Sequence, residues 1–470
     1  MSRLITLCVL SLVLAPLARA DVKLAGMFGD SMVLQRDKPI AVWGTAGAGE
    51  EVAVALAGKS AHAKAGDDGR WSVRLEALPA GGPFELVVTG ASEIRLHDVL
   101  VGEVWIVAGQ SNAEMPLSET ENGSAEAAQA HSARLRLFRE EEADSPTPLA
   151  DLKGGPWKSL APENASVWPA LGYYFATELQ GALDVPVGLI QCTQSGSPAE
   201  PWTERAALEQ DPELKPALQR FARKSKSMPG ALFNGMLAPL APFAIRGVLW
   251  YQGESNAMFA KQYRRLFPAL IGGWRKLCAQ GDFPFLFVQL AGYGPQPSEP
   301  GESQWAELRE AQALARALPN TGMALALDIG DAASLHPTNK RELGHRLALV
   351  ARAQVYGQKV ECRGPAFKSF EIQGDSVRVH FDHAGESLRV RGEGAVLGFA
   401  LAGADRKFHW ADAKIEGDTL VLKSAQVPAP VAVRYGWADN PPCNLVNSAG
   451  LPAEPFRTDD WTAPAPSEKR

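Results

Sequence analysis

Long apolar runs are scarce in this sequence. Beyond residue 20, no segment offers about 18 consecutive apolar residues, the length that a membrane-spanning helix requires. We therefore expect the mature chain to have no membrane span.

Cysteine and histidine are also few, with five cysteines and eight histidines in 470 residues. The histidines lack the H-x-x-x-H or mixed Cys-His spacing of a zinc site, and the cysteines form no C-x-x-C pair. We therefore expect neither a metal nor another cofactor. The spacing leaves the disulfide state open for the four cysteines that follow residue 20, which are Cys192, Cys278, Cys362 and Cys443.

Positive charge is in deficit. The 47 basic residues face 53 acidic ones, for a formal charge of −6. Without Arg3 and Arg19, which lie in the first twenty residues, the balance is 45 against 53, or −8. This excess of acid disfavours nucleic acid or an anionic membrane as a partner.

Residues 1–20 have the pattern of a secretory signal peptide. Arg3 precedes an apolar run that is too short to cross a membrane, and Ala18-Arg-Ala20 forms a small-x-small cleavage site before Asp21. We therefore predict a secreted or periplasmic protein, whose oligomeric state the sequence leaves open.

The remaining chain is longer than one hydrophobic core usually serves, and its patterns divide it into three domains. Residues 21–100 show period-two alternation between turn residues, which predicts a β domain. Residues 101–356 alternate strands with helices, which predicts a parallel sheet covered on both faces. Residues 357–462 return to a β pattern, and residues 463–470 form a polar tail that we expect to be disordered.

The central domain carries the clearest periodicity. Strands are predicted at 101–108, 185–192, 245–251, 283–290 and 322–327, with helices at 169–183, 259–274, 304–318 and 340–355. Asn339 is the expected N-cap of the last helix, with Glu342 three residues later. A helical insertion is predicted at about 203–229.

The first central strand ends at a candidate nucleophile. The apolar run before Ala108 is followed by Gly109-Gln-Ser-Asn112, and the loop that leaves a parallel strand is where open α/β sheets place their ligands. Gly109 permits a sharp turn that would leave the hydroxyl of Ser111 free. An ordinary strand-to-loop turn is the alternative.

Three other predicted strands also end in polar, glycine-bearing loops. They supply Gly196 after the second strand, Gln252 and Asn256 after the third, and His336 after the fifth. A purely structural sheet does not require such loops. Parallel strands bring their carboxyl ends to one edge of a sheet, so these loops are expected to meet.

Together these residues supply the parts that acyl transfer needs. Ser111 would attack the ester carbonyl and His336 would accept its proton. Gly196, with an amide from Gln252 or Asn256, would join the Ser111 backbone amide in stabilising the oxyanion. The alternatives are a histidine that only enters its helix and a glycine that only forms a turn.

Ser255 is a rival nucleophile, because Gly253-Glu-Ser-Asn256 echoes the first block. Ser111 is preferred. Neither block is the G-x-S-x-G elbow, since Ala113 and Ala257 replace the second glycine, which disfavours the α/β-hydrolase fold.

Several ordered blocks resemble the sialate O-acetylesterase family within the SGNH/GDSL-like hydrolases. The resemblance covers nearly the whole mature chain and rests on Asp30-Ser-Met-Val-Leu-Gln-Arg36, Gly109-Gln-Ser-Asn112, Ser195-Gly-Ser-Pro-Ala-Glu-Pro-Trp202, Trp250-Tyr-Gln-Gly-Glu-Ser-Asn256, His336-Pro-Thr-Asn-Lys340, Asn440-Pro-Pro-Cys-Asn-Leu-Val-Asn447 and Pro455-Phe-Arg-Thr-Asp459. It implies a three-layer α/β/α domain that removes acetyl groups from sugar hydroxyls with a serine nucleophile, a histidine base and no metal.

One position departs from the family pattern. The family commonly has Asp-x-x-His, with the aspartate orienting the imidazole, whereas Ala333 stands three residues before His336 here. Asp331 and Glu254 are the alternative carboxylates, and Asp328 is a further one. A Ser-His dyad held by a backbone carbonyl is the remaining possibility.

Two classes of function follow. The first is an exported carbohydrate O-acetylesterase acting on an O-acetylated sugar or glycan, with acetylated sialic acid as the first substrate and acetylxylan or another polysaccharide as the alternative. The second is a non-catalytic glycan-binding protein with a degenerate esterase domain, which the presence of Ala333 motivates. Sialic acid is anionic and calls for an arginine near Ser111, and the sequence does not show whether Arg205, Arg246 or another arginine supplies it.

Overall fold

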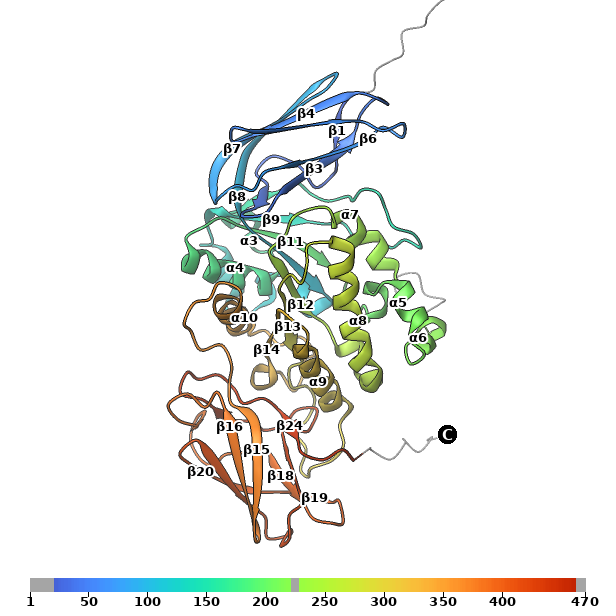
Figure 1. Cartoon of the computed structure of the whole chain (residues 1–470). Helices are drawn as coiled ribbons and strands as arrows, with labels where there is room; N and C mark the ends of the chain where they lie inside the picture. The colour runs from blue at the N-terminus through green and yellow to red at the C-terminus, as the bar shows by residue number, and fades with distance from the viewer. Residues whose placement is uncertain (1–20, 221–227, 462–470) are drawn as a thin grey trace, which may run out of the picture.

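The chain folds into three parts stacked end to end, with N-terminal strands above a central α/β part and C-terminal strands below (Figure 1). The structure is a computed structural model that describes residues 21–220 and 228–461. The predicted signal peptide and the predicted tail lie outside these described residues, as does the end of the predicted helical insertion.

The N-terminal part is built of strands, as its period-two pattern predicts, and its apolar core is continuous with that of the central part. Alternate side chains of β4 and β6 are buried, so each strand presents one face to the core. Strands β1, β3 and β6 form one sheet, while β4, β5 and β7 join the beginning of β8. The bounds are β1 (Lys23–Leu24), β2 (Val33–Gln35), β3 (Ile40–Thr45), β4 (Glu51–Leu56), β5 (Lys59–Lys64), β6 (Arg70–Leu75) and β7 (Gly81–Thr89).

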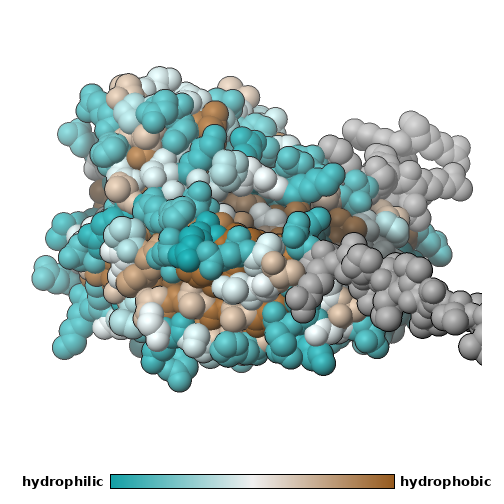
Figure 2. Space-filling view, turned by 90° about the horizontal axis from the view of Figure 1, so that it is seen from above, coloured by the Kyte–Doolittle hydropathy of each residue, from teal (hydrophilic) through white to brown (hydrophobic). Residues whose placement is uncertain are grey.

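The surface of this end is mixed in character. Figure 2 looks down on the N-terminal strands and shows hydrophilic residues over most of the face, with a hydrophobic band across its middle. A hollow of about 670 Å³ lies between β3, β6 and Pro242.

Strand β8 (Glu93–Gly109) joins the N-terminal and central parts. Its first half pairs antiparallel with β7 and alternates in exposure, whereas its second half lies between two parallel neighbours and is buried throughout. The predicted domain boundary at residue 100 therefore falls inside one continuous strand. A change of burial pattern without a turn signal marks this boundary.

The central sheet runs in the order β10-β9-β11-β8-β12-β13-β14. The predicted strands are all present with ends shifted by a few residues, as β11 (Val187–Thr193), β12 (Gly247–Tyr251), β13 (Phe285–Gln289) and β14 (Thr321–Leu325). Two further strands were not predicted, β9 (Ser132–Arg139) and β10 (Lys158–Leu160). Because β10 pairs antiparallel with β9, the sheet is mixed and the prediction of a purely parallel sheet needs correction.

Helices flank these strands. Figure 1 shows α4 and α10 on one side and α8 and α9 on the other, and α4 packs against α10 while α8 packs against α9. All four lie close to their predicted ranges, and the side chain of Asn339 caps α10 as expected, accepting from the backbone N–H of Glu342 at 3.1 Å. Their bounds are α4 (Ala170–Leu183), α8 (Ala260–Cys278), α9 (Gln304–Leu314) and α10 (Lys340–Gln354).

Shorter helical segments line the loops between these elements. The predicted insertion is helical where it is described, and its two helices, α5 (Arg205–Gln210) and α6 (Lys215–Arg220), lie beside α8. The remaining segments are α1 (Ser111–Glu114), η1 (Leu117–Glu119), α2 (Gly123–Ala127), α3 (Pro162–Ala165), η2 (Glu200–Trp202), η4 (Phe233–Leu237), α7 (Ala238–Leu240), η5 (Glu254–Phe259), η6 (Ala315–Ala317) and η7 (Leu327–Ile329).

The C-terminal part is built of strands and has an apolar core of its own. It holds two four-stranded sheets and a two-stranded one. The strands are β15 (Ala366–Gln373), β16 (Ser376–Asp382), β17 (Arg389–Val390), β18 (Phe399–Ala402), β19 (Phe408–Trp410), β20 (Asp412–Glu416), β21 (Thr419–Lys423), β22 (Ala432–Tyr435), β23 (Leu445–Val446) and β24 (Phe456–Arg457).

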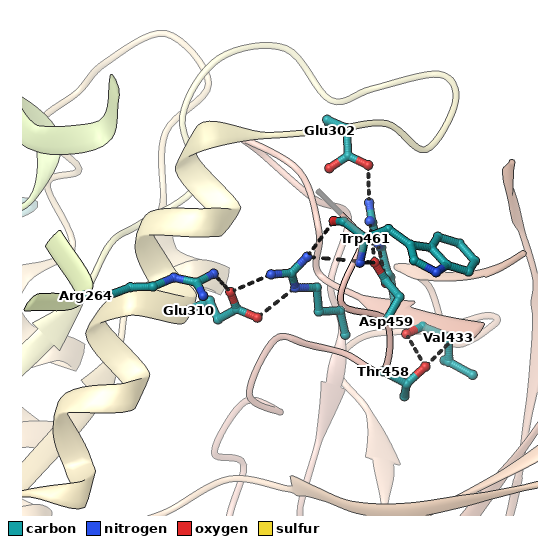
Figure 3. A network of polar contacts seen from close by, with 9 residues as sticks. Arg264, Glu302, Glu310, Val433, Thr458, Asp459 and Trp461 are labelled. Carbon is teal, nitrogen blue, oxygen red and sulfur yellow. Dashed lines mark hydrogen bonds and ion pairs between the residues drawn. The ribbon is translucent and has the colours of Figure 1, made fainter. Parts of the chain in front are cut away.

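A network of ion pairs fastens this domain to the central part (Figure 3). Glu310 of α9 accepts from Arg264 of α8 and from Arg457 of β24, the latter at 2.8 Å. Arg434 of β22 binds Asp459 and Glu302, each at 2.9 Å. Charged groups that share partners lose less side-chain freedom per bond than isolated pairs, so the network favours a fixed position for the C-terminal domain.

The four cysteines that follow residue 20 are free thiols, with Cys192 and Cys278 buried. The described residues contain no helix long and apolar enough to cross a membrane.

Candidate active site

Ser111 begins the short helix α1, directly after the buried end of β8. Gly109 has a φ of +133°, and a Cβ atom there would lie 2.1 Å from the carbonyl oxygen of Tyr251 on the neighbouring strand. Only glycine tolerates both conditions. The turn leaves Ser111 partly exposed at the edge of the sheet while its neighbour Asn112 is buried.

The side chain of Ser111 meets that of His336. The distance between Ser111 Oγ and His336 Nε2 is 2.7 Å, although the two residues are separated by 225 positions in the sequence. His336 lies in the loop between η7 and α10. This separation is short enough for direct proton transfer from a hydroxyl to an imidazole.

The surroundings of His336 favour its neutral form. Burial lowers the pKa of His336, the positive charge of Lys340 lowers it further, and the negative charge of Glu119 opposes both effects. A general base must be unprotonated, so this shift extends its competence to lower pH.

The candidate carboxylates do not hydrogen-bond to the His336 ring. Within residues 21–220 and 228–461, Asp331 Oδ1 accepts from the backbone N–H of Ala333 at 2.8 Å, and Glu254 Oε1 accepts from Asn112 Nδ2 at 2.5 Å. Asp328 forms a buried ion pair with Arg346, whose Nη1 lies 2.6 Å away. The backbone N–H of His336 itself donates to Ser334 Oγ at 3.1 Å.

The carboxylate of Glu254 is unusual in its own right. Its Oε2 atom is buried without a hydrogen-bond partner among the described residues, and burial raises the pKa of Glu254. The role of third catalytic member therefore remains a prediction for both Asp331 and Glu254.

Gly196 lies in the turn after β11, close to both nucleophile candidates. Its φ of +72° favours glycine, and its N–H has no hydrogen-bond partner in the part of the chain that the structure describes. The neighbouring Ser195 donates to Glu114 Oε2 at 2.7 Å, and Glu114 is the last residue of the helix that begins with Ser111. The Oγ of Ser255 donates to the carbonyl of Gly196 at 3.3 Å.

Gln252 and Asn256 lie beneath the Gly196 loop, and both are fully buried. Gln252 Nε2 donates to Asn256 Oδ1 at 2.7 Å, and Asn256 Oδ1 also accepts from the backbone N–H of Ala199 at 2.9 Å. Asn256 Nδ2 donates to Glu200 Oε2 at 3.0 Å. Both amides thus bind the segment that carries Gly196, and their predicted role as oxyanion donors remains a prediction.

A hollow of about 480 Å³ borders this site at the carboxyl ends of β9 and β11. No sequence pattern singled out the residues of this hollow, although Glu114 follows Ser111 by three positions. Arg139, the last residue of β9, makes no side-chain hydrogen bond or ion pair with any residue that the structure describes. The lining includes Glu114, Arg139, Glu141, Lys158, Trp168 and Thr193.

The two arginines considered from the sequence lie elsewhere. Arg246 binds Glu103 at 2.6 Å, in the interior of β8 and away from the strand end that precedes Ser111. Arg205 binds Glu209 at 2.8 Å on the surface of α5. Neither Arg205 nor Arg246 lines the hollow beside Glu114. No group of three or more potential metal ligands occurs among the described residues.

Known proteins resemble this chain over most of its length. The family described as "Carbohydrate esterase, sialic acid-specific acetylesterase" matches residues 101–353. The sialate O-acetylesterase of Rattus norvegicus is 30% identical over 508 residues, covering 92% of this chain and 94% of the rat protein. The human sialate O-acetylesterase is 29% identical and covers 92% of each chain.

A solved structure also resembles this chain over most of its length. The crystal structure of a carbohydrate acetylesterase from Xanthomonas citri aligns with a TM-score of 0.88 and 44% identity, covering 94% of this chain and 100% of that one. The resemblance first seen in the ordered motifs is thus confirmed across the sequence and the fold. The chain belongs to the sialic acid-specific acetylesterase family of carbohydrate esterases.

Proposed function

We propose that this protein is an exported carbohydrate O-acetylesterase in which Ser111 is the nucleophile and His336 the general base. The observation that carries the proposal is the 2.7 Å contact between Ser111 Oγ and His336 Nε2 in a chain of this family. The arrangement of helices on both sides of the strands supports a three-layer α/β/α domain of the SGNH type. The pattern of residues 1–20 supports a secreted or periplasmic location.

The reaction would proceed through an acetyl-enzyme. His336 Nε2 accepts the proton of Ser111 as Oγ forms a bond to the acetyl carbon, and the carbonyl becomes an oxyanion. The ester bond then breaks, and the sugar oxygen leaves with the proton that His336 returns. In the second half, His336 takes a proton from water, the resulting nucleophile attacks the acetyl carbon, and acetate leaves as Ser111 regains its proton.

Two backbone amides are suited to stabilise the oxyanion. The N–H of Gly196 is unoccupied in the described part of the chain, and that of Ser111 begins a helix, where no intrahelical acceptor exists. We infer that Gln252 and Asn256 act on this site by holding the Gly196 loop, since their hydrogen bonds run to its backbone and to Glu200.

The hollow beside Glu114 is suited to the sugar that carries the acetyl group. It adjoins the helix of Ser111, and the exposed Val167 together with several charged side chains offers the mixed lining that sugars bind. Arg139 is available to a sialic acid carboxylate, which makes O-acetylated sialic acid the first substrate. Glu114 and Glu141 line the same hollow, and their charge favours the second candidate, a neutral sugar such as that of acetylxylan.

Acetate release tests the proposal directly. The purified chain is incubated with a chromogenic acetate ester, O-acetylated sialic acid and acetylated xylose oligomers, and acetate is measured enzymatically. We expect release from the chromogenic ester and from at least one sugar. Absence of release from every ester would support the non-catalytic glycan-binding function instead.

Replacing Arg139 distinguishes the two sugar classes. If sialic acid is the substrate, Arg139→Gln is expected to lower kcat/KM for it about 10- to 100-fold, because a charged hydrogen bond is worth about 1.5–3 kcal/mol. Release from the neutral oligomers should change less than about twofold, since they carry no charge for Arg139 to bind.

The matched control is Arg134→Gln on the same strand, where the guanidinium binds Asp184 at 2.7 Å. It should leave both substrates unaffected. Equal effects of Arg139→Gln on charged and neutral sugars would contradict a role for Arg139 in recognising the carboxylate.

A further inference from the structure

Lys340 is a buried cation in the loop-to-helix junction that follows His336. Its side chain is 0% exposed, and Nζ donates to Pro337 O at 2.6 Å and to Asn112 Oδ1 at 2.7 Å. It also lies 5.4 Å from the centroid of the Tyr251 ring. These contacts connect the segment after His336 to the residue after Ser111.

Position 340 is unfavourable for a lysine for two electrostatic reasons. Lys340 is the first residue of α10, where the positive end of the helix dipole disfavours a cation, and burial adds a desolvation cost. Burial accordingly lowers the pKa of Lys340 to about 7. A lysine in such a place implies that its contacts provide a compensating advantage.

The side chain of Asn112 links Lys340 to Glu254 and to the backbone of Leu335. Its Oδ1 accepts from Lys340, while its Nδ2 donates to Glu254 Oε1 at 2.5 Å and to Leu335 O at 3.0 Å. Asn112 and Lys340 are buried, so water competes little for the bond between them, whereas Glu254 and Leu335 are only partly buried. The Lys340–Asn112–Glu254 network therefore joins three loops that follow different strands.

The network holds both sides of the catalytic histidine. Leu335 O is bound by Asn112 and Pro337 O by Lys340, so the backbone on either side of His336 is fixed to the residue that follows Ser111. We propose that Lys340 is a positioning residue, which with Asn112 holds His336 against Ser111 where the family usually employs an aspartate. The inference rests on the proposed function of Ser111 and His336.

Several charged groups shift the pKa values of His336 and Lys340. Lys340 on α10 lowers the pKa of His336 and Glu119 on η1 raises it, while Glu254 on η5 raises the pKa of Lys340. Tyr251 on β12 faces the ammonium group, and Arg309 on α9 acts in turn on Tyr251. Among these groups, Lys340 supplies the positive charge that acts on the imidazole.

The test replaces Lys340 by methionine, an unbranched side chain one atom shorter that removes the charge and donors. Lys340→Met is expected to lower kcat for the chromogenic ester about 100-fold, because a small displacement of the base disturbs the reacting geometry, with KM within about twofold. Removing the cation also raises the pKa of His336, so the acid limb of the kcat/KM profile moves to higher pH.

The matched control is Lys38→Met. Among the described residues, Lys38 is the other lysine whose burial lowers its pKa, to about 8, and its Nζ donates to Ile245 O at 2.6 Å near the start of β12. This change should reduce stability and leave the pH profile unaltered. An unchanged kcat and pH profile in folded Lys340→Met would overturn the proposal, whereas a wild-type chain inactive on every ester would overturn the proposed function instead.

Two more variants guard against misfolding, which circular dichroism detects. Asn112→Leu removes the link with a side chain of the same branching and should lower kcat to a similar degree, while Lys340→Gln should recover part of kcat without restoring the acid limb. If the residues act as one network, Lys340→Met and Asn112→Leu together lose no more than the worse single variant. Additive losses, or wild-type kcat in Asn112→Leu, would contradict the network.

Discussion

Ser111→Ala is expected to reduce acetate release about 10⁴-fold or more on every active ester. The hydroxyl forms the covalent bond in the proposed mechanism, and removing the nucleophile of a serine hydrolase leaves only the residual effect of binding and oxyanion donors. His336 and the Gly196 turn remain in place, and the side chain of Ser111 is partly exposed, so the variant should fold normally. Initial rates with the chromogenic ester and the thermal midpoint measure both parts of this expectation.

Ser255→Ala is the matched control, because the same block pattern made Ser255 a rival. Its Oγ binds the carbonyl of Gly196, and the Ser111 hydroxyl is the one beside the imidazole. We expect a loss of less than about tenfold, from a loosened Gly196 loop. Loss of activity in Ser255→Ala with retention in Ser111→Ala would reverse the assignment of the nucleophile.

The proximity of Ser111 and His336 was predictable because strand ends are strong signals. The apolar runs before Gly109, Gly196, Gln252 and His336 indicated parallel strands, and parallel strands gather their following loops at one edge. The direct contact between Ser111 and His336 agrees with this argument. Periodicity supplied the elements, and chain topology then brought distant residues together.

Strand β9 shows where periodicity fails. Its sequence places arginines among apolar residues, and Arg136 is buried within the sheet because it binds Asp98 at 2.7 Å. The sequence alone does not distinguish an arginine that is buried with an ion-pair partner from one that is exposed to solvent. Strand β8 fails differently, since it continues without a turn from one domain into the next.

Side-chain direction was the other unpredictable feature. Gln252 and Asn256 follow a strand that ends at the site, yet they point into the core, where they bind the segment after Gly196. The sequence of a turn does not specify which of its side chains faces the ligand. The carboxylate partner of His336 was equally undetermined, because Asp331 and Glu254 bind backbone and amide groups that the sequence does not display.

One signal for the positioning network was present in the sequence. Lys340 follows the predicted N-cap Asn339, so a cation occupies the first turn of a helix where acidic residues are favoured. Such a conflict between a residue and its local position often marks a functional constraint. Only the structure, however, identifies Asn112 and the backbone around His336 as the groups that Lys340 binds.

His336→Ala is expected to lower kcat/KM about 10³- to 10⁴-fold, because Ser111 then loses the group that takes its proton. In the wild-type chain, kcat/KM should fall at acid pH with an apparent pKa lower than that of an ordinary histidine, since burial and the charge of Lys340 lower the pKa of His336. A lowered pKa keeps the imidazole neutral at a lower pH, so the acid limb moves toward acid. Hydrolysis rates of the chromogenic ester between about pH 4 and 9 give the position of this acid limb.

His345→Gln is the matched control, since His345 lies on α10 and its pKa is raised by a hydrogen bond to Glu178. Its removal should leave the acid limb unchanged, whereas the residual activity of His336→Ala should lack that limb altogether. An acid limb that disappears with His345 and persists without His336 would show that the titrating base lies elsewhere. With the limb assigned to His336, its movement in Lys340→Met measures how far the buried lysine sets the acid range of the enzyme.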